Sequence, residues 1–273
     1  MKTTVQYAMQ AALCFVAFVI IQFAVMLCTR MIVKDITLNA TALIVRSLVA
    51  SAITIALFAW RRWTVMSRNY IYSRPWSSFV WIITAAIGII PLSSLLLDFC
   101  GLRISNDAVR IYANMINHEF GYLTIGIIAP VAEEIVFRGA ILCALLKVFD
   151  KRMHWVAIAV SAVLFGIVHG NMAQGVNATL IGLLLGWMYY KTDSIVPGVI
   201  FHWTNNTIVY VMMKLMPGTY NMTMSEFCGG DTRKIAILAV CALCVLIPSI
   251  FQLTARLKKK ISLRTHGNVS NEI

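Results

Sequence analysis

The sequence predicts an all-α fold: a polytopic transmembrane helical bundle with about eight spans and a polar intramembrane cavity. Two observations lead to this prediction. Of the 273 residues, 60% are hydrophobic and 12% are charged, whereas a soluble domain is about half apolar and about a quarter charged. In addition, apolar windows of about 20 residues recur along the chain, and this length crosses roughly 30 Å of hydrocarbon.

The windows give the order of the expected spans. The first window is not a cleavable signal peptide, because its apolar core is long and no A-x-A-like site with a polar mature domain follows it. A seven-span arrangement stays open, since residues 111–149 can be divided in more than one way. We expect spans near residues 6–27, 41–60, 79–99, 121–148, 153–170, 176–191, 195–213 and 235–255.

The spans and the segments between them predict one domain. We expect a single transmembrane domain over residues 1–261, with a core at about 121–213 that carries the polar motifs. A short polar cytoplasmic tail follows at 262–273, and its composition is typical of a mobile terminus.

The formal net charge of +12 does not indicate a nucleic-acid partner. The Lys and Arg residues cluster beside span ends, in "RRWTVMSRNYIYSR", "KVFDKR" and "RLKKKISLR". Cytoplasmic loops of membrane proteins carry such an excess, where it contacts anionic lipid headgroups. With eight spans and both termini cytoplasmic, all three clusters fall on one side of the membrane.

The stretch "APVAEEIVFRGAIL" places three charges inside the fourth expected span. One ionisable side chain at the bilayer centre costs roughly 2.5–3.5 kcal/mol on insertion scales. Glu134 and Arg138 are four residues apart, on one helix face, with the acid in the favourable N-terminal position. Glu133 is turned about 100° away from this pair. We therefore expect Glu134 to neutralise Arg138 while Glu133 faces something else.

Two further polar pairs interrupt apolar helices. "FGIVHG" places Phe165 four residues before His169, and "FHWTNN" places His202 four residues before Asn206. Each pair lies on one helix face. A single buried histidine is more often part of a helix–helix hydrogen bond than of a site. Polar clusters on three separate helices, however, predict one shared polar cavity that relieves the desolvation cost of all of them.

The motifs E-E-x-x-x-R, F-x-x-x-H and H-x-x-x-N occur here in this order. They resemble the signature motifs of the CPBP family, also called the Abi family. This family comprises type II CAAX prenyl endopeptidases and bacteriocin-processing or self-immunity proteins. The resemblance covers about residues 129–210. The residues that fill the motifs are Glu133, Glu134, Arg138, Phe165, His169, His202 and Asn206, and Phe137 and Gly139 commonly accompany the first motif.

The resemblance implies an intramembrane endopeptidase, and the residue types suit peptide hydrolysis. Glu133 is the expected general base, since a partly dry carboxylate gains base strength. His169 would hold or polarise the same water. His202 and Asn206 would donate to the developing oxyanion. Glu134, Arg138 and Phe165 would support them.

Other chemistries compete for the same residues. Glu133, His169 and His202 could supply a two-His-one-carboxylate zinc set. The sequence lacks H-E-x-x-H, and Arg138 would repel a nearby metal, so we favour a site without a cofactor. A serine mechanism is disfavoured because Ser161 has no G-x-S-x-G context and no evident acid.

A second class of function stays open. Some bacterial relatives of this kind act in bacteriocin self-immunity or regulation, so the protein could bind a membrane partner such as a sensor kinase without catalysis. Intact motif residues favour the enzyme. A transporter is disfavoured, since the chain has no internal symmetry.

The expected partners are the lipid bilayer and a peptide or lipidated-protein substrate. The substrate would be a prenylated CAAX-type protein or a bacterial leader, bacteriocin or signalling peptide. Without organellar targeting or retention signals, the chain fits a bacterial plasma membrane.

Overall fold

The computed structural model describes residues 3–33, 39–64, 69–72, 76–219 and 222–257. Within these ranges the chain forms helices and their connections and contains no β-strand, which confirms the predicted all-α class. The expected tail at 262–273, and with it the end of the expected domain at residue 261, lies outside the described residues.

Four helices in the described part of the chain are long and apolar enough to cross a membrane. They coincide with the first three expected spans and the last one. Most of the apolar residues of these helices are not buried within the protein. In the apolar window of the last helix, only 11% of the residues are buried. Side chains of this kind belong in lipid rather than in water. The four helices are α1 (Thr4–Ile32), α2 (Ala40–Trp60), α4 (Trp76–Phe99) and α12 (Thr232–Arg256).

The other four expected spans fall on helices that do not meet the same test of length and composition. The window 121–148 becomes one continuous helical stretch in which α-helical and π-helical segments alternate, and α8 has 14 residues, about 21 Å. The count of eight therefore stays a prediction. The segments are η2 (Leu123–Ile128), α6 (Ala129–Glu134), η3 (Ile135–Leu142), α7 (Cys143–Val148), α8 (His154–Ile167), α9 (Met172–Thr192) and α10 (Val196–Leu215).

Shorter helices connect the long ones. The 12-residue α5 (Asn106–Asn117) is preceded by its N-cap Ser105, whose side chain accepts the Ala108 N–H. Its apolar and polar residues lie on opposite faces, which suits a helix at the edge of a bundle. The remaining short helices are α3 (Asn69–Tyr72), η4 (Lys151–Met153), η5 (Pro217–Thr219) and α11 (Met224–Phe227).

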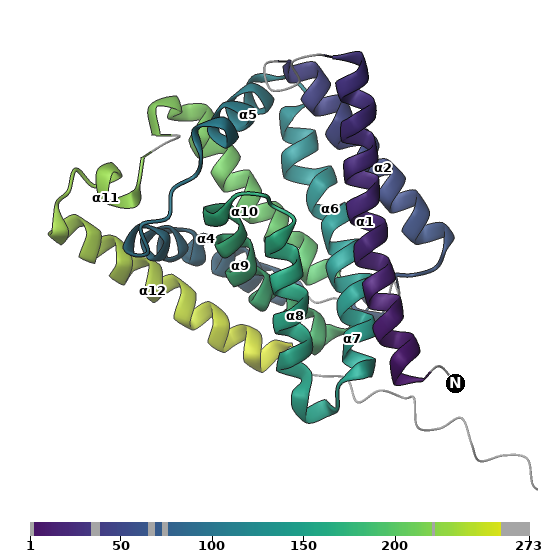
Figure 1. Cartoon of the computed structure of the whole chain (residues 1–273). Coiled ribbons are helices and arrows are strands. Elements are labelled where there is room, and N and C mark those ends of the chain that lie inside the picture. Colours follow the sequence, from purple (N-terminus) through teal and green to yellow (C-terminus); the bar gives the residue numbers. More distant parts are fainter. Residues whose placement is uncertain (1–2, 34–38, 65–68, 73–75, 220–221, 258–273) are drawn as a thin grey trace, which may run out of the picture.

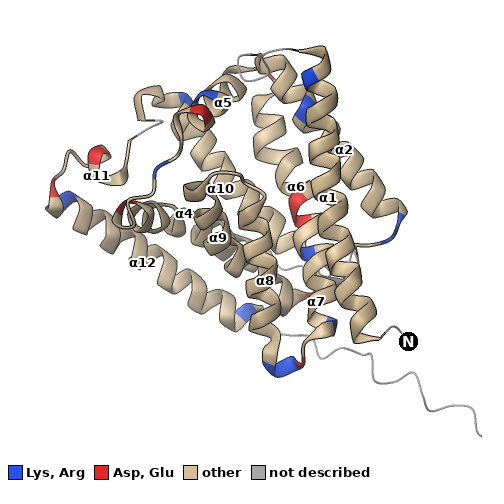
Figure 2. Ribbon diagram, in the orientation of Figure 1, with Lys and Arg blue, Asp and Glu red and all other residues tan. Residues whose placement is uncertain are grey.

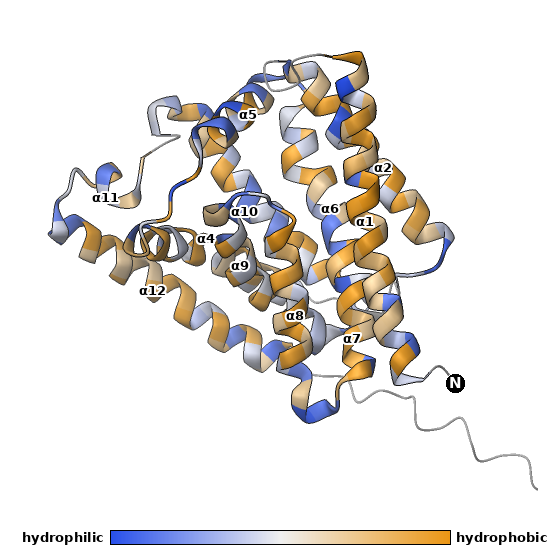
Figure 3. Cartoon of the chain, in the orientation of Figure 1, coloured by the Kyte–Doolittle hydropathy of each residue, from blue (hydrophilic) through white to orange (hydrophobic). Residues whose placement is uncertain are grey.

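The motif-bearing helices lie between two pairs of long apolar helices (Figure 1). On one side, α1 packs on η3, where the rings of Phe18 and Phe137 meet edge to face at 5.4 Å. On the other side, α4 and α12 are joined by a 2.8 Å hydrogen bond between the hydroxyls of Thr84 and Ser249. The polar motifs are thus enclosed by helices composed mainly of hydrophobic residues (Figure 3), many of which are exposed on the protein surface.

Charged residues concentrate at helix ends, whereas α6 carries acidic residues in the middle of the bundle (Figure 2). The start of α1, the basic turn between α7 and α8, and the end of α12 lie at the same end of the bundle (Figure 1). This placement is the one that cytoplasmic termini require. The side of the membrane on which they lie stays a prediction.

The hairpin of α8 and α9 depends on glycine. A Cβ atom at Gly166 would meet Thr179 Oγ1 and lie 2.5 Å from the carbonyl oxygen of Gly175. The two helices can therefore approach closely only because neither position carries a side chain. The hairpin positions His169, three residues after Gly166.

Changing Gly166 to alanine should destabilise the protein by about 1–3 kcal/mol, since overpacking outweighs the gain of about 0.5–1 kcal/mol from removing a helical glycine. The measurement is thermal unfolding in detergent. Gly218→Ala is the matched control, because a Cβ there meets nothing within 4 Å. Equal melting temperatures for the two variants would contradict this packing argument.

Candidate active site

Two π-helical stretches flank the glutamate doublet, η2 before it and η3 after it. In η2 the Ala129 N–H donates to the carbonyl five residues earlier, that of Thr124. In the same register the next bond would run from Pro130 to Ile125, but proline has no N–H. The Ile125 carbonyl instead accepts from Nδ2 of Asn206 at 3.0 Å. A proline in α6 thus fixes the position of a motif residue in α10.

Carbonyls around η3 are also bonded by side chains of other segments. Thr64 Oγ1 donates to the Ile135 carbonyl at 3.0 Å, and Ser161 Oγ donates to the Phe137 carbonyl at 2.8 Å. Such bonds satisfy a helix that departs from α geometry. Because the Ser161 hydroxyl is buried and bonded to a carbonyl, its placement agrees with the sequence argument against a serine nucleophile.

Glu134 and Arg138 form the ion pair that their spacing predicts. Arg138 Nη1 lies 2.8 Å from Glu134 Oε1, and the two side chains are 1% and 0% exposed. Arg138 Nη2 also donates to the Gly182 carbonyl at 3.3 Å, and the guanidinium lies 4.5 Å from the centre of the Phe165 ring. The arginine is therefore held by a carboxylate, a carbonyl and an aromatic face.

Phe165 brings the two motif histidines together. Its ring meets those of His169 and His202 nearly at right angles, with centroids 4.9 Å and 5.7 Å away. His169 Nδ1 lies 2.8 Å from the Phe165 carbonyl oxygen. Since a carbonyl can only accept, Nδ1 carries the proton and Nε2 is left for another partner.

Glu133 is the more accessible acid of the doublet. Its side chain is 24% exposed, and Oε2 lies 3.6 Å from His202 Nε2. The other ring nitrogen of His202 lies 3.4 Å from Glu134 Oε1. His202 thus lies between both glutamates, although its Nδ1 makes no hydrogen bond there, and no ion pair joins Glu133 to Arg138.

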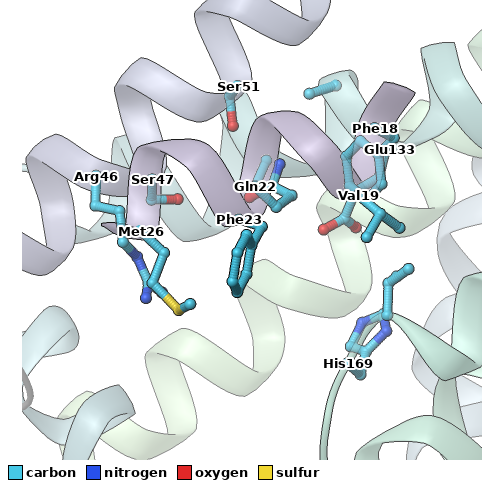
Figure 4. A pocket seen from close by; sticks show the side chains of 13 residues that line it. Phe18, Val19, Gln22, Phe23, Met26, Arg46, Ser47, Ser51, Glu133 and His169 are labelled. Carbon is cyan, nitrogen blue, oxygen red and sulfur yellow. The ribbon is translucent and has the colours of Figure 1, made fainter. Parts of the chain in front are cut away.

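Two cavities meet at Glu133. The smaller, of about 380 Å³, lies among α1, α2 and α6 and reaches His169 (Figure 4). The larger, of about 610 Å³, lies among α5, α9 and α10 and is also lined by His202 and Asn206. Because Glu133 and His169 line both, the three motifs predicted from sequence share one polar space.

Asn206, which the sequence predicts as an oxyanion donor, already makes two side-chain hydrogen bonds within the protein. Its amide nitrogen donates to Ile125, and its Oδ1 accepts from Asn205 Nδ2 at 3.3 Å. One of its two N–H bonds therefore remains for a ligand in the cavity. Asn205, which the sequence argument did not select, orients Asn206.

The zinc alternative would require Glu133, His169 and His202 to converge on one point. Among the residues that the structure describes, no group of three or more His, Cys, Asp or Glu side chains is arranged to hold a metal ion. Glu133 and His202 are close together, but His169 does not complete a ligand set with them.

Sequence reasoning missed two residues that line the cavities, Tyr112 of α5 and Arg46 of α2. Burial raises the pKa of Tyr112, and the negative charge of Glu133 raises it further, which places this phenol near the expected base. Arg46 lines both cavities together with Glu133. Neither lies in a motif, but an arginine within an apolar span is a signal that could have been used.

The buried pair should behave as a unit. Glu134→Gln alone should cost about 3–5 kcal/mol of unfolding free energy, because it leaves the Arg138 charge buried without its partner. The double variant Glu134→Gln/Arg138→Met should cost clearly less than the sum of the two single changes. Denaturant unfolding of the four proteins in detergent measures the coupling, and strict additivity would contradict it.

Comparison with known proteins agrees with the motifs. Residues 117–208 match the family model described as "Type II CAAX prenyl endopeptidase Rce1-like". This range contains all the motif residues and excludes α1, α2, α4 and α12. Over 91 residues the chain is 35% identical to the Bacillus subtilis (strain 168) protein "Putative membrane peptidase YdiL". The match spans 33% of this chain and 36% of that protein, about a third of its length. No solved structure matches.

Proposed function

We propose that this integral membrane protein, whose residues 117–208 match the Rce1-like family model, is a peptidase in which Glu133 activates water. The position of Glu133 carries the proposal. It lines both cavities beside His169, 3.6 Å from His202, whereas the neighbouring Glu134 is engaged by Arg138.

The positions of the side chains support the following steps of hydrolysis. A water held between Glu133 and Nε2 of His169 gives a proton to the Glu133 carboxylate, and its oxygen bonds to the carbonyl carbon of the substrate. The oxyanion accepts hydrogen bonds from His202 and from the remaining N–H of Asn206. Glu133 next gives its proton to the leaving nitrogen as the C–N bond breaks. The products are a carboxylic acid and an amine.

Glu134 and Arg138 act on this reaction through the positions of neighbouring side chains. A second ionised carboxylate without a partner would compete with Glu133 for His202 and for water. Neutralised by Arg138, Glu134 instead lies beside the His202 ring, with Oε1 3.4 Å from Nδ1. Arg138 also packs on the face of Phe165, and His169 lies two residues beyond the end of the helix that carries Phe165.

The walls of the smaller cavity favour a substrate with an apolar end. Side chains from α1 line it, among them Phe18, Val19, Phe23 and Met26. A prenylated CAAX-type protein fits this requirement, and so does an apolar bacterial leader, bacteriocin or signalling peptide. In either case we place the protein in a bacterial plasma membrane with cytoplasmic termini.

Glu133→Gln should abolish peptidase activity with a loss of at least about 10²–10⁴-fold, the usual contribution of a general base. The assay uses purified protein with a prenylated CAAX peptide and a panel of leader peptides. Glu119→Gln is the matched control, since it makes the same change on an exposed acid that lines neither cavity.

Adding a strong zinc chelator to the same assay distinguishes the glutamate mechanism from a zinc mechanism. Activity that survives chelation supports the glutamate mechanism, and activity lost to chelator and restored by zinc overturns it. If Glu133→Gln retains the full cellular phenotype of the protein, the peptidase proposal fails, and a self-immunity or regulatory role without catalysis replaces it.

A further inference from the structure

Helix α9 carries a line of carboxamides. Asn171 is the residue before the helix, and Gln174 and Asn177 follow at intervals of three residues, so the latter two are neighbours on the helix surface. All three line the larger cavity. The rest of the helix is largely apolar, in the stretch "ATLIGLLLGWM". Amides in an apolar helix are costly, and here they occur where the helix borders the cavity.

A structural role in the fold explains the presence of one of the three amides. Asn171 is the N-cap of α9, and its Oδ1 accepts the backbone N–H of Gln174 at 3.2 Å. The side chains of Gln174 and Asn177 make no hydrogen bond within the described part of the protein. Asn177 Oδ1 is moreover buried, with no donor among the described residues. Capping explains Asn171, but neither capping nor packing explains Gln174 and Asn177.

The unused groups indicate the chemistry of a ligand. Asn177 Oδ1 requires a donor, and the Gln174 carboxamide can both donate and accept. A polypeptide main chain offers N–H and C=O groups in alternation, whereas an acyl or prenyl chain offers neither. The amides of α9 therefore suit the main chain of a peptide rather than its lipid or apolar end.

The location of these amides connects them with the reaction. The cavity that they line is the one that contains Glu133, His169 and His202, and the apolar walls contributed by α1 belong to the smaller cavity. A peptide whose main chain lies along α9 could thus place a neighbouring peptide bond at Glu133. Its apolar end could enter the smaller cavity (Figure 4).

We propose that Asn177, together with Gln174, forms a subsite that binds the main chain of the peptide substrate through carboxamide hydrogen bonds. This proposal rests on the proposed peptidase function. Because the bonds go to the main chain, the subsite positions the peptide without selecting a side chain at that place. Both residues are positioning residues, so they act on substrate affinity more than on the chemical step.

The test uses a peptide that the unmodified protein cleaves and analogues of it, each methylated at one amide nitrogen. One analogue should show a KM raised by about tenfold with kcat little changed, the effect of one lost hydrogen bond. Asn177→Leu should raise the KM of the parent peptide by a similar factor. Its KM for the methylated analogue should then equal its KM for the parent peptide. Gln252→Leu, an amide change on α12 away from both cavities, is the matched control.

Two results would overturn the subsite proposal while leaving the peptidase function intact. One is an unchanged KM of Asn177→Leu for the parent peptide, and the other is an unchanged difference in KM between the parent peptide and the methylated analogue. If Asn177→Leu does not fold, Gln174→Leu is tested in the same way. If the unmodified protein cleaves no peptide, the proposed function fails separately. Binding of a fluorescent peptide to the unmodified protein and to Asn177→Leu then tests the subsite, and equal affinities would overturn it.

Discussion

The ion pair of Glu134 and Arg138 is the interaction on which the site depends. Two charges inside an apolar bundle are tolerated because they neutralise each other at 2.8 Å. Neighbouring helices approach the pair through glycine: a Cβ at Gly182 would lie 3.2 Å from Arg138 Nη2, and one at Gly198 would clash with the Glu134 carboxylate. Helices α9 and α10 can therefore close around the pair, and Glu133 is left to face the cavity.

The spacing of residues along one α-helix predicted much of this arrangement. The pairing of Glu134 with Arg138 and the separate orientation of Glu133 depend on positions within one helix, so the sequence alone was enough. The shared cavity followed from the cost of burying polar residues on three helices. The all-helical class followed from composition, and four spans are recognisable by length and hydropathy.

Features that depend on contacts between helices could not be predicted. The bond from Asn206 to Ile125 requires the π-helical register before Pro130, and no sequence pattern reports that register. Tyr112 reaches the cavity from α5, which lies before the motifs. The unbonded oxygen of Asn177 likewise becomes evident only when the neighbours of α9 are placed. The number of spans stays a prediction for a related reason, since α8 has only 14 residues and α9 and α10 carry polar side chains among their apolar ones.

The central claim is that Glu133 activates water and does not itself attack the substrate. A single turnover in water enriched in oxygen-18, with the products analysed by mass spectrometry, tests this claim most directly. The account predicts one heavy oxygen in the new carboxyl group of the product and none in Glu133. An unlabelled product from the first turnover, with the heavy oxygen later found in the Glu133 carboxylate, would indicate a covalent intermediate and contradict the account.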